Sequence, residues 1–245
     1  MLKILPLTAV GLSLGLSAAS ADTFDNASLA SPGVYFGTGN INSGFTVVQS
    51  GGVELGLEAI ERYVGPVTPS GDTYDVATGN TTVAGETGAY WGVVFSVNTN
   101  YLGTSSTTLA NITPSLTLTD VNNGTTQGFN LLLIPDNSLY GSSGVCSPQS
   151  ACGSLSNYYA FQNSEALSFP AVAAALGDPG YDVNANDTYD FTLSLREGDR
   201  TLASDSIVVQ AGTGTPVPEP FTLSLFGAGL AGAAALRRRK RAQKV

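Results

Sequence analysis

The chain has 245 residues, a net charge of −9 at neutral pH, no histidine and two cysteines. Without histidine there is no Ser-His-Asp triad and no imidazole ligand to zinc, and two cysteines are too few for a four-cysteine zinc site. The glycine patterns of phosphate-binding and dinucleotide-binding loops are also missing from the sequence. Composition therefore excludes several common classes of enzyme.

The first 21 residues have the pattern of a secretory signal peptide. Lys3 provides a positive charge, residues 4–18 form a mostly apolar run, and residues 19–21 (Ala-Ser-Ala) supply a small-residue cleavage site. We expect export through the Sec machinery and a mature N-terminus at Asp22. A permanent N-terminal anchor is the alternative interpretation.

The segment between the two ends of the chain is strongly acidic. Residues 22–216 contain 18 acidic residues and only three basic ones, Arg62, Arg196 and Arg200, which leaves a net charge of −15. This charge repels nucleic acid and anionic lipid, so we expect no nucleic-acid partner. Cations, neutral polysaccharide and other envelope proteins are compatible partners, and a need for solubility would also explain the charge.

Short apolar segments separated by Gly, Asn, Ser and Pro predict one all-β domain over residues 22–215. The expected fold is an antiparallel β-sandwich, either Ig-like or jelly-roll-like. One helix is predicted at residues 169–176, which Gly177 follows. The predicted strands are residues 34–36, 45–48, 53–64, 73–77, 90–97, 115–121, 129–134, 188–196 and 201–210.

Two of these segments have clear burial patterns. In residues 53–64 apolar residues alternate with Glu54 and Glu58, which predicts a half-buried strand with its acidic face in solvent. Residues 90–97 are apolar on both faces, as expected of a strand in the middle of a sheet. We therefore expect Trp91 in the core.

The two cysteines, Cys146 and Cys152, lie close together in the sequence. In an exported protein they are expected to form a disulfide, which would stabilise the fold by roughly 2–3 kcal/mol in the chain-entropy model. The bond is interpreted as a structural staple, and a rigid display loop is the functional alternative. Redox chemistry is not favoured, because the spacing is not Cys-x-x-Cys.

The densest group of acidic and amide side chains is a candidate calcium site. Asp182, Asn184, Asn186, Asp187 and Asp190 offer oxygen ligands within nine residues. However, Asp187 stands where an EF-hand loop needs glycine, and a leucine stands where that loop needs its glutamate. Asn and Asp are also common in ordinary turns, so a turn is the favoured interpretation and no metal or cofactor is firmly predicted.

The last 30 residues, 216–245, have three parts. The first is a stiff, proline-rich motif and the second is an uncharged run at residues 221–236. As a helix, these sixteen residues span roughly 24 Å, close to the roughly 30 Å of a hydrocarbon core, so they predict a transmembrane helix. An amphipathic core helix is the alternative. The motif consists of Val217, Pro218, Glu219 and Pro220.

The third part, residues 237–245, is basic and predicts a stop-transfer signal that stays in the cytoplasm. A Pro-Glu-Pro motif, a short apolar helix and an arginine cluster in this order resemble the PEP-CTERM sorting signal of Gram-negative bacteria. The resemblance implies transient anchoring in the inner membrane, recognition by exosortase (a membrane cysteine protease), and removal of the tail before the domain reaches the cell surface or the medium. The basic cluster consists of Arg237, Arg238, Arg239, Lys240 and Arg241.

Two classes of function remain compatible with the sequence. The favoured one is a non-enzymatic protein of the envelope or extracellular matrix, associated with exopolysaccharide or biofilm. The alternative is a secreted enzyme that acts on glycans through two carboxylates, which would face one another across a cleft. No residue is assigned a catalytic role.

Overall fold

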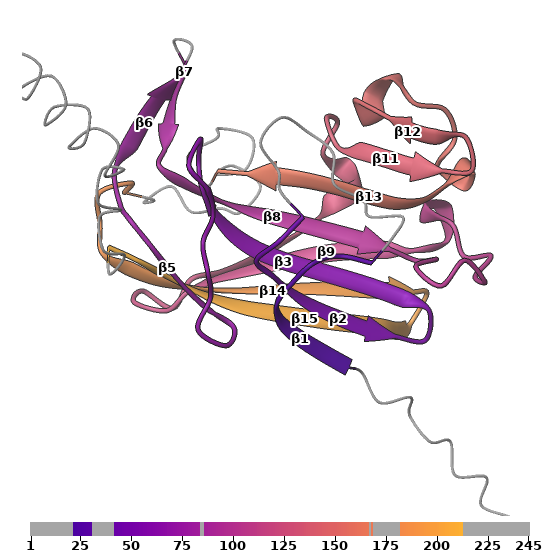
Figure 1. Cartoon of the computed structure of the whole chain (residues 1–245), viewed down its shortest axis with the longest axis horizontal. Coiled ribbons are helices and arrows are strands. Elements are labelled where there is room, and N and C mark those ends of the chain that lie inside the picture. Colours follow the sequence, from indigo (N-terminus) through magenta and orange to yellow (C-terminus); the bar gives the residue numbers. More distant parts are fainter. Residues whose placement is uncertain (1–21, 31–41, 84–85, 167, 169–181, 213–245) are drawn as a thin grey trace, which may run out of the picture.

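A computed structural model describes residues 22–30, 42–83, 86–166, 168 and 182–212. These residues form two main β-sheets whose inner faces share a hydrophobic core, and a third, two-stranded sheet (Figure 1). The predicted all-β class is therefore confirmed, and the arrangement resembles a β-sandwich. The helical elements of this part of the chain are short 3-10 turns at Leu109–Asn111, Leu131–Leu133, Gln149–Ala151 and Leu155–Asn157.

The larger sheet has eight strands, and every pair of neighbours in it is antiparallel. Its order is β1-β2-β3-β8-β13-β11-β12, and the short β4 pairs with β3. The bounds are Asp22–Ala27 for β1, Phe45–Ser50 for β2, Val53–Glu61 for β3, Gly65–Pro66 for β4, Trp91–Asn98 for β8, Ser138–Gly141 for β11, Gly144–Cys146 for β12 and Tyr158–Glu165 for β13.

The smaller sheet has the order β10-β9-β14-β15-β5. Its strands are antiparallel except for β15 and β5, which run parallel, so the predicted antiparallel arrangement has one exception. A further pair, β6 with β7, forms the third sheet. The bounds are Thr73–Val76 for β5, Asn80–Val83 for β6, Glu86–Ala89 for β7, Thr113–Asp120 for β9, Thr126–Asn130 for β10, Asp187–Glu197 for β14 and Arg200–Ala211 for β15.

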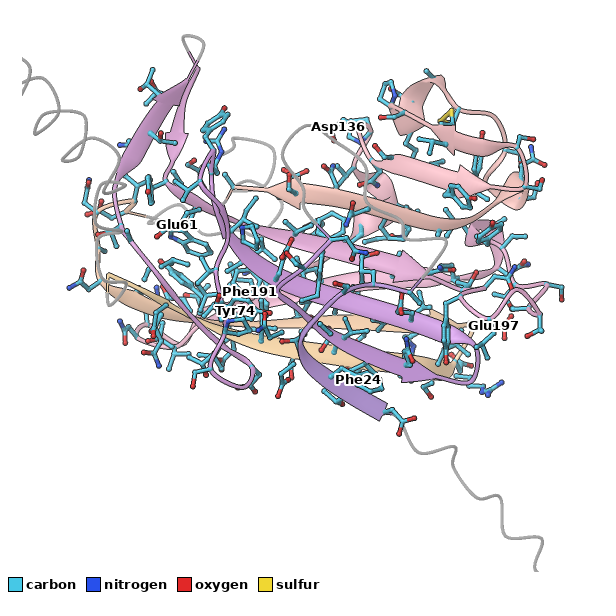
Figure 2. All side chains as sticks on the ribbon, in the orientation of Figure 1. Phe24, Glu61, Tyr74, Asp136, Phe191 and Glu197 are labelled. Carbon is cyan, nitrogen blue, oxygen red and sulfur yellow. A yellow bond between two sulfur atoms is a disulfide. The ribbon has the colours of Figure 1, made fainter. Side chains whose placement is uncertain are left out.

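Trp91 joins the two main sheets. The prediction that it is buried in a central strand is confirmed, because β8 lies between β3 and β13 and the side chain is 1% exposed. Its ring contacts Tyr189 and Phe191 on β14, with centroid distances of 5.6 and 6.3 Å. Tyr74 and Phe191 lie in the same interior (Figure 2). The core is thus made of aromatic side chains from both sheets.

The prediction of a half-buried β3 is wrong, because both faces of this strand are covered. Glu54 and Glu58 are buried, at 2% and 0% exposure. Leu29 and Phe45 lie over the glycine between them, since a Cβ on Gly56 would come within 2.6 Å of Leu29. The absence of a side chain at Gly56 therefore lets a second, smaller hydrophobic cluster form on the outer face of the sheet.

Two predicted strand ends are also wrong. β3 stops at Glu61 because the chain turns at Tyr63, which has a positive φ of 68°. The strand expected at residues 129–134 ends at Asn130, whose side chain accepts a hydrogen bond from the Leu132 N–H and starts a 3-10 turn. The strand expected at 34–36 and the helix expected at 169–176 lie outside the described residues.

Candidate functional site

A polar groove lies where one edge of the larger sheet meets the smaller sheet. It has a volume of about 400 Å³, within the usual range for ligand sites. The strands β1 and β2 form one wall, while β15 and the turn that leads into β5 form the other. The residues that line it are Thr23, Asp25, Thr46, Val48, Gly71, Asp72, Ser204, Asp205 and Ser206.

The floor of the groove consists of Thr46, Val48 and Asp205, which are buried, whereas the other lining residues are exposed and form its rim. Thr46 belongs to a hydrogen-bond network beneath the groove. Its Oγ1 lies 3.1 Å from the Tyr74 hydroxyl, which donates to the Gly44 carbonyl oxygen at 2.7 Å. Tyr74 has a single hydroxyl proton, so Thr46 is the donor in the bond between the two hydroxyls.

Asp205 is the most unusual residue of the groove. It is 3% exposed, and its Oδ2 has no hydrogen-bond partner among the described residues. Burial raises the pKa of Asp205 to about 8, an effect that backbone hydrogen bonds from Ser206 and Leu57 oppose. The negative charges of Asp25 and Asp72 raise it further. At neutral pH the side chain is therefore mostly a neutral carboxylic acid.

The rim of the groove is acidic and rich in hydroxyl groups. Asp25 and Asp72 supply carboxylates, Thr23, Ser204 and Ser206 supply hydroxyls, and none of the described residues lining the groove is basic. No three His, Cys, Asp or Glu side chains in the described part of the chain gather as metal ligands. The polar groups that the groove offers are therefore hydroxyls and carboxyl groups.

No sequence pattern predicts this groove as a whole, although β15 contains a signal. The inward positions of this strand are Ala203, Asp205, Ile207, Val209 and Ala211, all of which are buried. Asp205 is the one ionisable residue among these inward positions, and the others are apolar. A buried polar residue in such a pattern is the informative exception. Apart from Ser204 and Ser206 on the same strand, the residues that line the groove with Asp205 come from other strands and a turn, and could not be found by local pattern.

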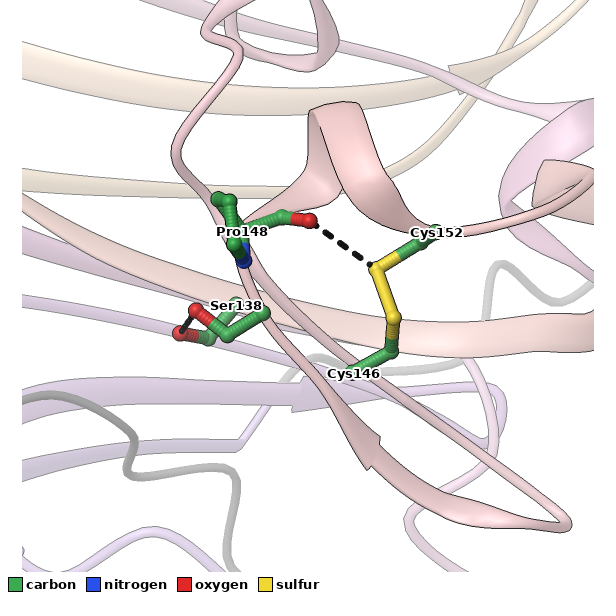
Figure 3. The surroundings of a disulfide bond; sticks show 5 residues. Ser138, Cys146, Pro148 and Cys152 are labelled. Carbon is green, nitrogen blue, oxygen red and sulfur yellow. Dashed lines mark hydrogen bonds between the residues drawn. A yellow bond between two sulfur atoms is a disulfide. The ribbon is translucent and has the colours of Figure 1, made fainter.

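The predicted disulfide between Cys146 and Cys152 is confirmed, with a Cα–Cα distance of 5.9 Å (Figure 3). It joins β12 to the residue after a 3-10 turn, and the loop between them contains a cis peptide bond before Pro148. Cys152 Sγ lies 3.2 Å from the Pro148 carbonyl oxygen. This is a contact and not a hydrogen bond, because a disulfide sulfur has no proton to donate.

The residues of the candidate calcium site are divided between a turn and a strand. Asp182 accepts a hydrogen bond from the Asn184 N–H at 2.9 Å, as expected of an Asx turn. Asp187 and Asp190 lie on β14. The Asp187 carboxylate accepts the N–H of the next residue, Thr188, at 2.7 Å. Asp182 also accepts from the Asn184 side chain, at 3.2 Å. Each of the two aspartates thus caps a backbone N–H within two residues, as turn residues do.

The signal-peptide residues and the whole tail lie outside the described residues. These include the motif residues Val217, Pro218, Glu219 and Pro220, and the basic cluster at 237–241. In the portion of the chain that is described, no helix is long and apolar enough to cross a membrane.

Residues 216–240 match a family model for the PEP-CTERM protein-sorting motif. No curated protein and no solved structure matches the chain. The protein is thus mainly β and has a C-terminal sorting signal of the kind typical of Gram-negative bacteria, which implies export and processing at the membrane. More specifically, it is a PEP-CTERM domain-containing protein, and the motif implies recognition by exosortase, a membrane protein.

Proposed function

We propose that the mature protein is a non-enzymatic component of the cell envelope or extracellular matrix that binds exopolysaccharide through the groove. The sorting motif supports a destination beyond the inner membrane. The observation that carries the proposal is the lining of the groove, in which hydroxyls and carboxyl groups surround a buried polar floor. Such groups form hydrogen bonds with the vicinal hydroxyls of sugars.

The exported domain is acidic, which also favours this partner over charged polymers. Residues 22–216 have only three basic side chains against 18 acidic ones. Nucleic acid and anionic lipid would be repelled by this surface, whereas an uncharged polysaccharide would not. Anchoring in the inner membrane is proposed to be transient and to end when exosortase acts near Pro218, Glu219 and Pro220.

The proposal is tested with the protein released by a host that carries exosortase. This protein is mixed with exopolysaccharide from the same host and sedimented at physiological salt. We expect it to enter the polysaccharide pellet, whereas the Thr46→Val variant enters it less. Recovery of wild type in the supernatant at all polysaccharide concentrations would contradict the proposal. Release of new reducing ends from the polysaccharide would favour the glycan-active enzyme instead.

A further inference from the structure

We infer that the groove selects an uncharged sugar segment, and that Thr46 and Asp205 on its floor determine this specificity. The inference rests on the proposed binding of polysaccharide and adds which polysaccharides are accepted. Asp205 marks the groove as a site that a ligand would complete. Its side chain lines the groove, and its Oδ2 is a buried polar atom without a hydrogen-bond partner among the described residues.

Thr46 acts as an acceptor for the ligand. Its hydroxyl proton is directed to the Tyr74 oxygen, because the proton of Tyr74 is used in the bond to the Gly44 carbonyl. The oxygen lone pairs of Thr46 are therefore the groups that remain for a donor in the groove. A sugar hydroxyl supplies such a donor. Tyr74 is itself buried, so the direction of this network does not depend on solvent.

Asp205 has the complementary role of a donor. As a neutral carboxylic acid it carries an O–H, and a buried O–H without an acceptor costs free energy until it is paired. A hydroxyl oxygen of the ligand provides the missing acceptor. One sugar hydroxyl group can accept from Asp205 while another donates to Thr46. The floor thus offers one donor and one acceptor, which suits a polyol, because each of its hydroxyl groups can both donate and accept.

The rim determines which sugars are rejected. The carboxylates of Asp25 and Asp72 lie close enough to Asp205 to raise its pKa. They also repel the carboxylates of uronic acids and the sulfate or phosphate groups of modified sugars. No described residue that lines the groove offers a positive charge to offset this repulsion. An uncharged polyhydroxyl segment is not repelled by these carboxylates.

Ionisation of Asp205 predicts how binding depends on pH. The titratable groups that act on it are Asp25 on β1, Asp72 before β5, and Tyr74 on β5. Burial raises the pKa of Tyr74 far above its ordinary value, so Tyr74 stays neutral across the range tested. As pH rises through about 8, Asp205 loses the proton that it donates to the ligand. Affinity for a neutral sugar should therefore fall from pH 6.5 to pH 9.5.

The experiment uses the released mature protein and two probes. These are the neutral and the uronate-containing fractions of the host's exopolysaccharide, separated by anion exchange. We expect binding to the neutral fraction and at least tenfold weaker binding to the acidic one. Thr46→Val and Asp205→Ala should each weaken binding by about three- to tenfold, the loss of one hydrogen bond. Asp205→Asn keeps a donor, so it should bind at pH 7 and lose the pH dependence. Asp190→Asn, on an exposed residue of β14, is the matched control and should behave as wild type.

The outcomes separate the inference from the proposed function. Equal binding of both fractions by wild type, or unchanged affinity in both floor variants, would overturn the inference and leave polysaccharide binding in place. Failure of wild type to bind either fraction would overturn both. Circular dichroism of each variant shows whether the fold is retained. A pH dependence that persists in Asp205→Asn would also contradict the assigned role of Asp205.

Discussion

The indole of Trp91 on β8 lies 5.6 Å from the ring of Tyr189 on β14, with the two planes tilted by 42°. This contact joins the central strand of one sheet to the middle of the other. Phe191, two residues further along β14, meets the same indole edge to face at 87°. Aromatic pairs of this geometry contribute about 0.5–1.5 kcal/mol beyond the free energy of burial.

Removal of the Trp91 side chain is therefore expected to destabilise the domain strongly. Trp91→Ala should lower the free energy of unfolding by about 3–5 kcal/mol, since the indole is fully buried. The measurement is urea denaturation followed by circular dichroism. Leu133→Ala, at a side chain that is 79% exposed, is the control and should change stability little. An unaltered midpoint for Trp91→Ala, with a wild-type emission spectrum typical of exposed tryptophan, would contradict the observed core.

Because the Glu58 carboxyl group is buried, we expect the domain to be more stable at pH 5 than at pH 9. Burial raises its pKa to about 9, and neither carboxyl oxygen has a hydrogen-bond partner among the described residues. The unfolded chain releases this proton near pH 4.5, whereas the folded chain keeps it until about pH 9. The unfolded state therefore binds fewer protons between these values, and the free energy of unfolding falls as pH rises. Burial raises the pKa of Asp205 and Glu165 as well, to about 8 and about 7, with the same sign.

The test compares denaturation curves at pH 5 and pH 9. Wild type should lose free energy of unfolding between the two, because Glu58, Asp205 and Glu165 all ionise in this range in the folded protein. Glu58→Gln cannot ionise at this position, so its loss should be smaller than that of wild type by on the order of 3–6 kcal/mol. Glu197→Gln, at an exposed carboxylate at the end of β14, should keep the wild-type dependence (Figure 2). Equal slopes for wild type and Glu58→Gln would rule out this assignment.

The disulfide between Cys146 and Cys152 predicts a released protein without free thiols. Thiol labelling of denatured, unreduced protein should detect none, and labelling after reduction should detect two per chain. Replacing both cysteines with serine should lower the free energy of unfolding by roughly 2–3 kcal/mol, because the unfolded chain regains the freedom of a short loop. Two reactive thiols before reduction would be inconsistent with the bond.

Processing of the tail is expected to depend on the proline-rich motif. Proline fixes the backbone and lacks an N–H, so residues 218–220 are expected to stay extended and accessible to a protease. Replacing Pro218, Glu219 and Pro220 with alanine should leave full-length protein in the membrane fraction of a host that carries exosortase. Pro216→Ala, just outside the triplet, is the control and should be processed normally.

The intact mass of the released wild-type protein shows directly whether the tail is removed. The expected mass lacks residues 221–245. A mass that includes them would identify the tail as a plain anchor. The sorting motif matched at residues 216–240 would then have a role other than as a processing signal.

The sequence pattern predicts those features of the protein that neighbouring residues in the chain determine. Two cysteines six positions apart predict their disulfide, because an exported protein oxidises its thiols and a loop this short costs little entropy to close. The apolar run from Trp91 predicts a central strand, because both of its faces must be buried. The order of motif, apolar run and basic cluster identifies the sorting signal, since a protease and a membrane read it along the chain.

Tertiary structure decided what covers each face. Alternation placed Glu54 and Glu58 on one side of β3, but only the packing of Leu29 over Gly56 buries that side. The same holds for the groove. Thr46, Tyr74 and Asp205 lie on three strands of two sheets, and no spacing in the sequence relates them. Strand periodicity determines which residues share a face, whereas the contacts between sheets determine whether that face meets water, a core or a ligand.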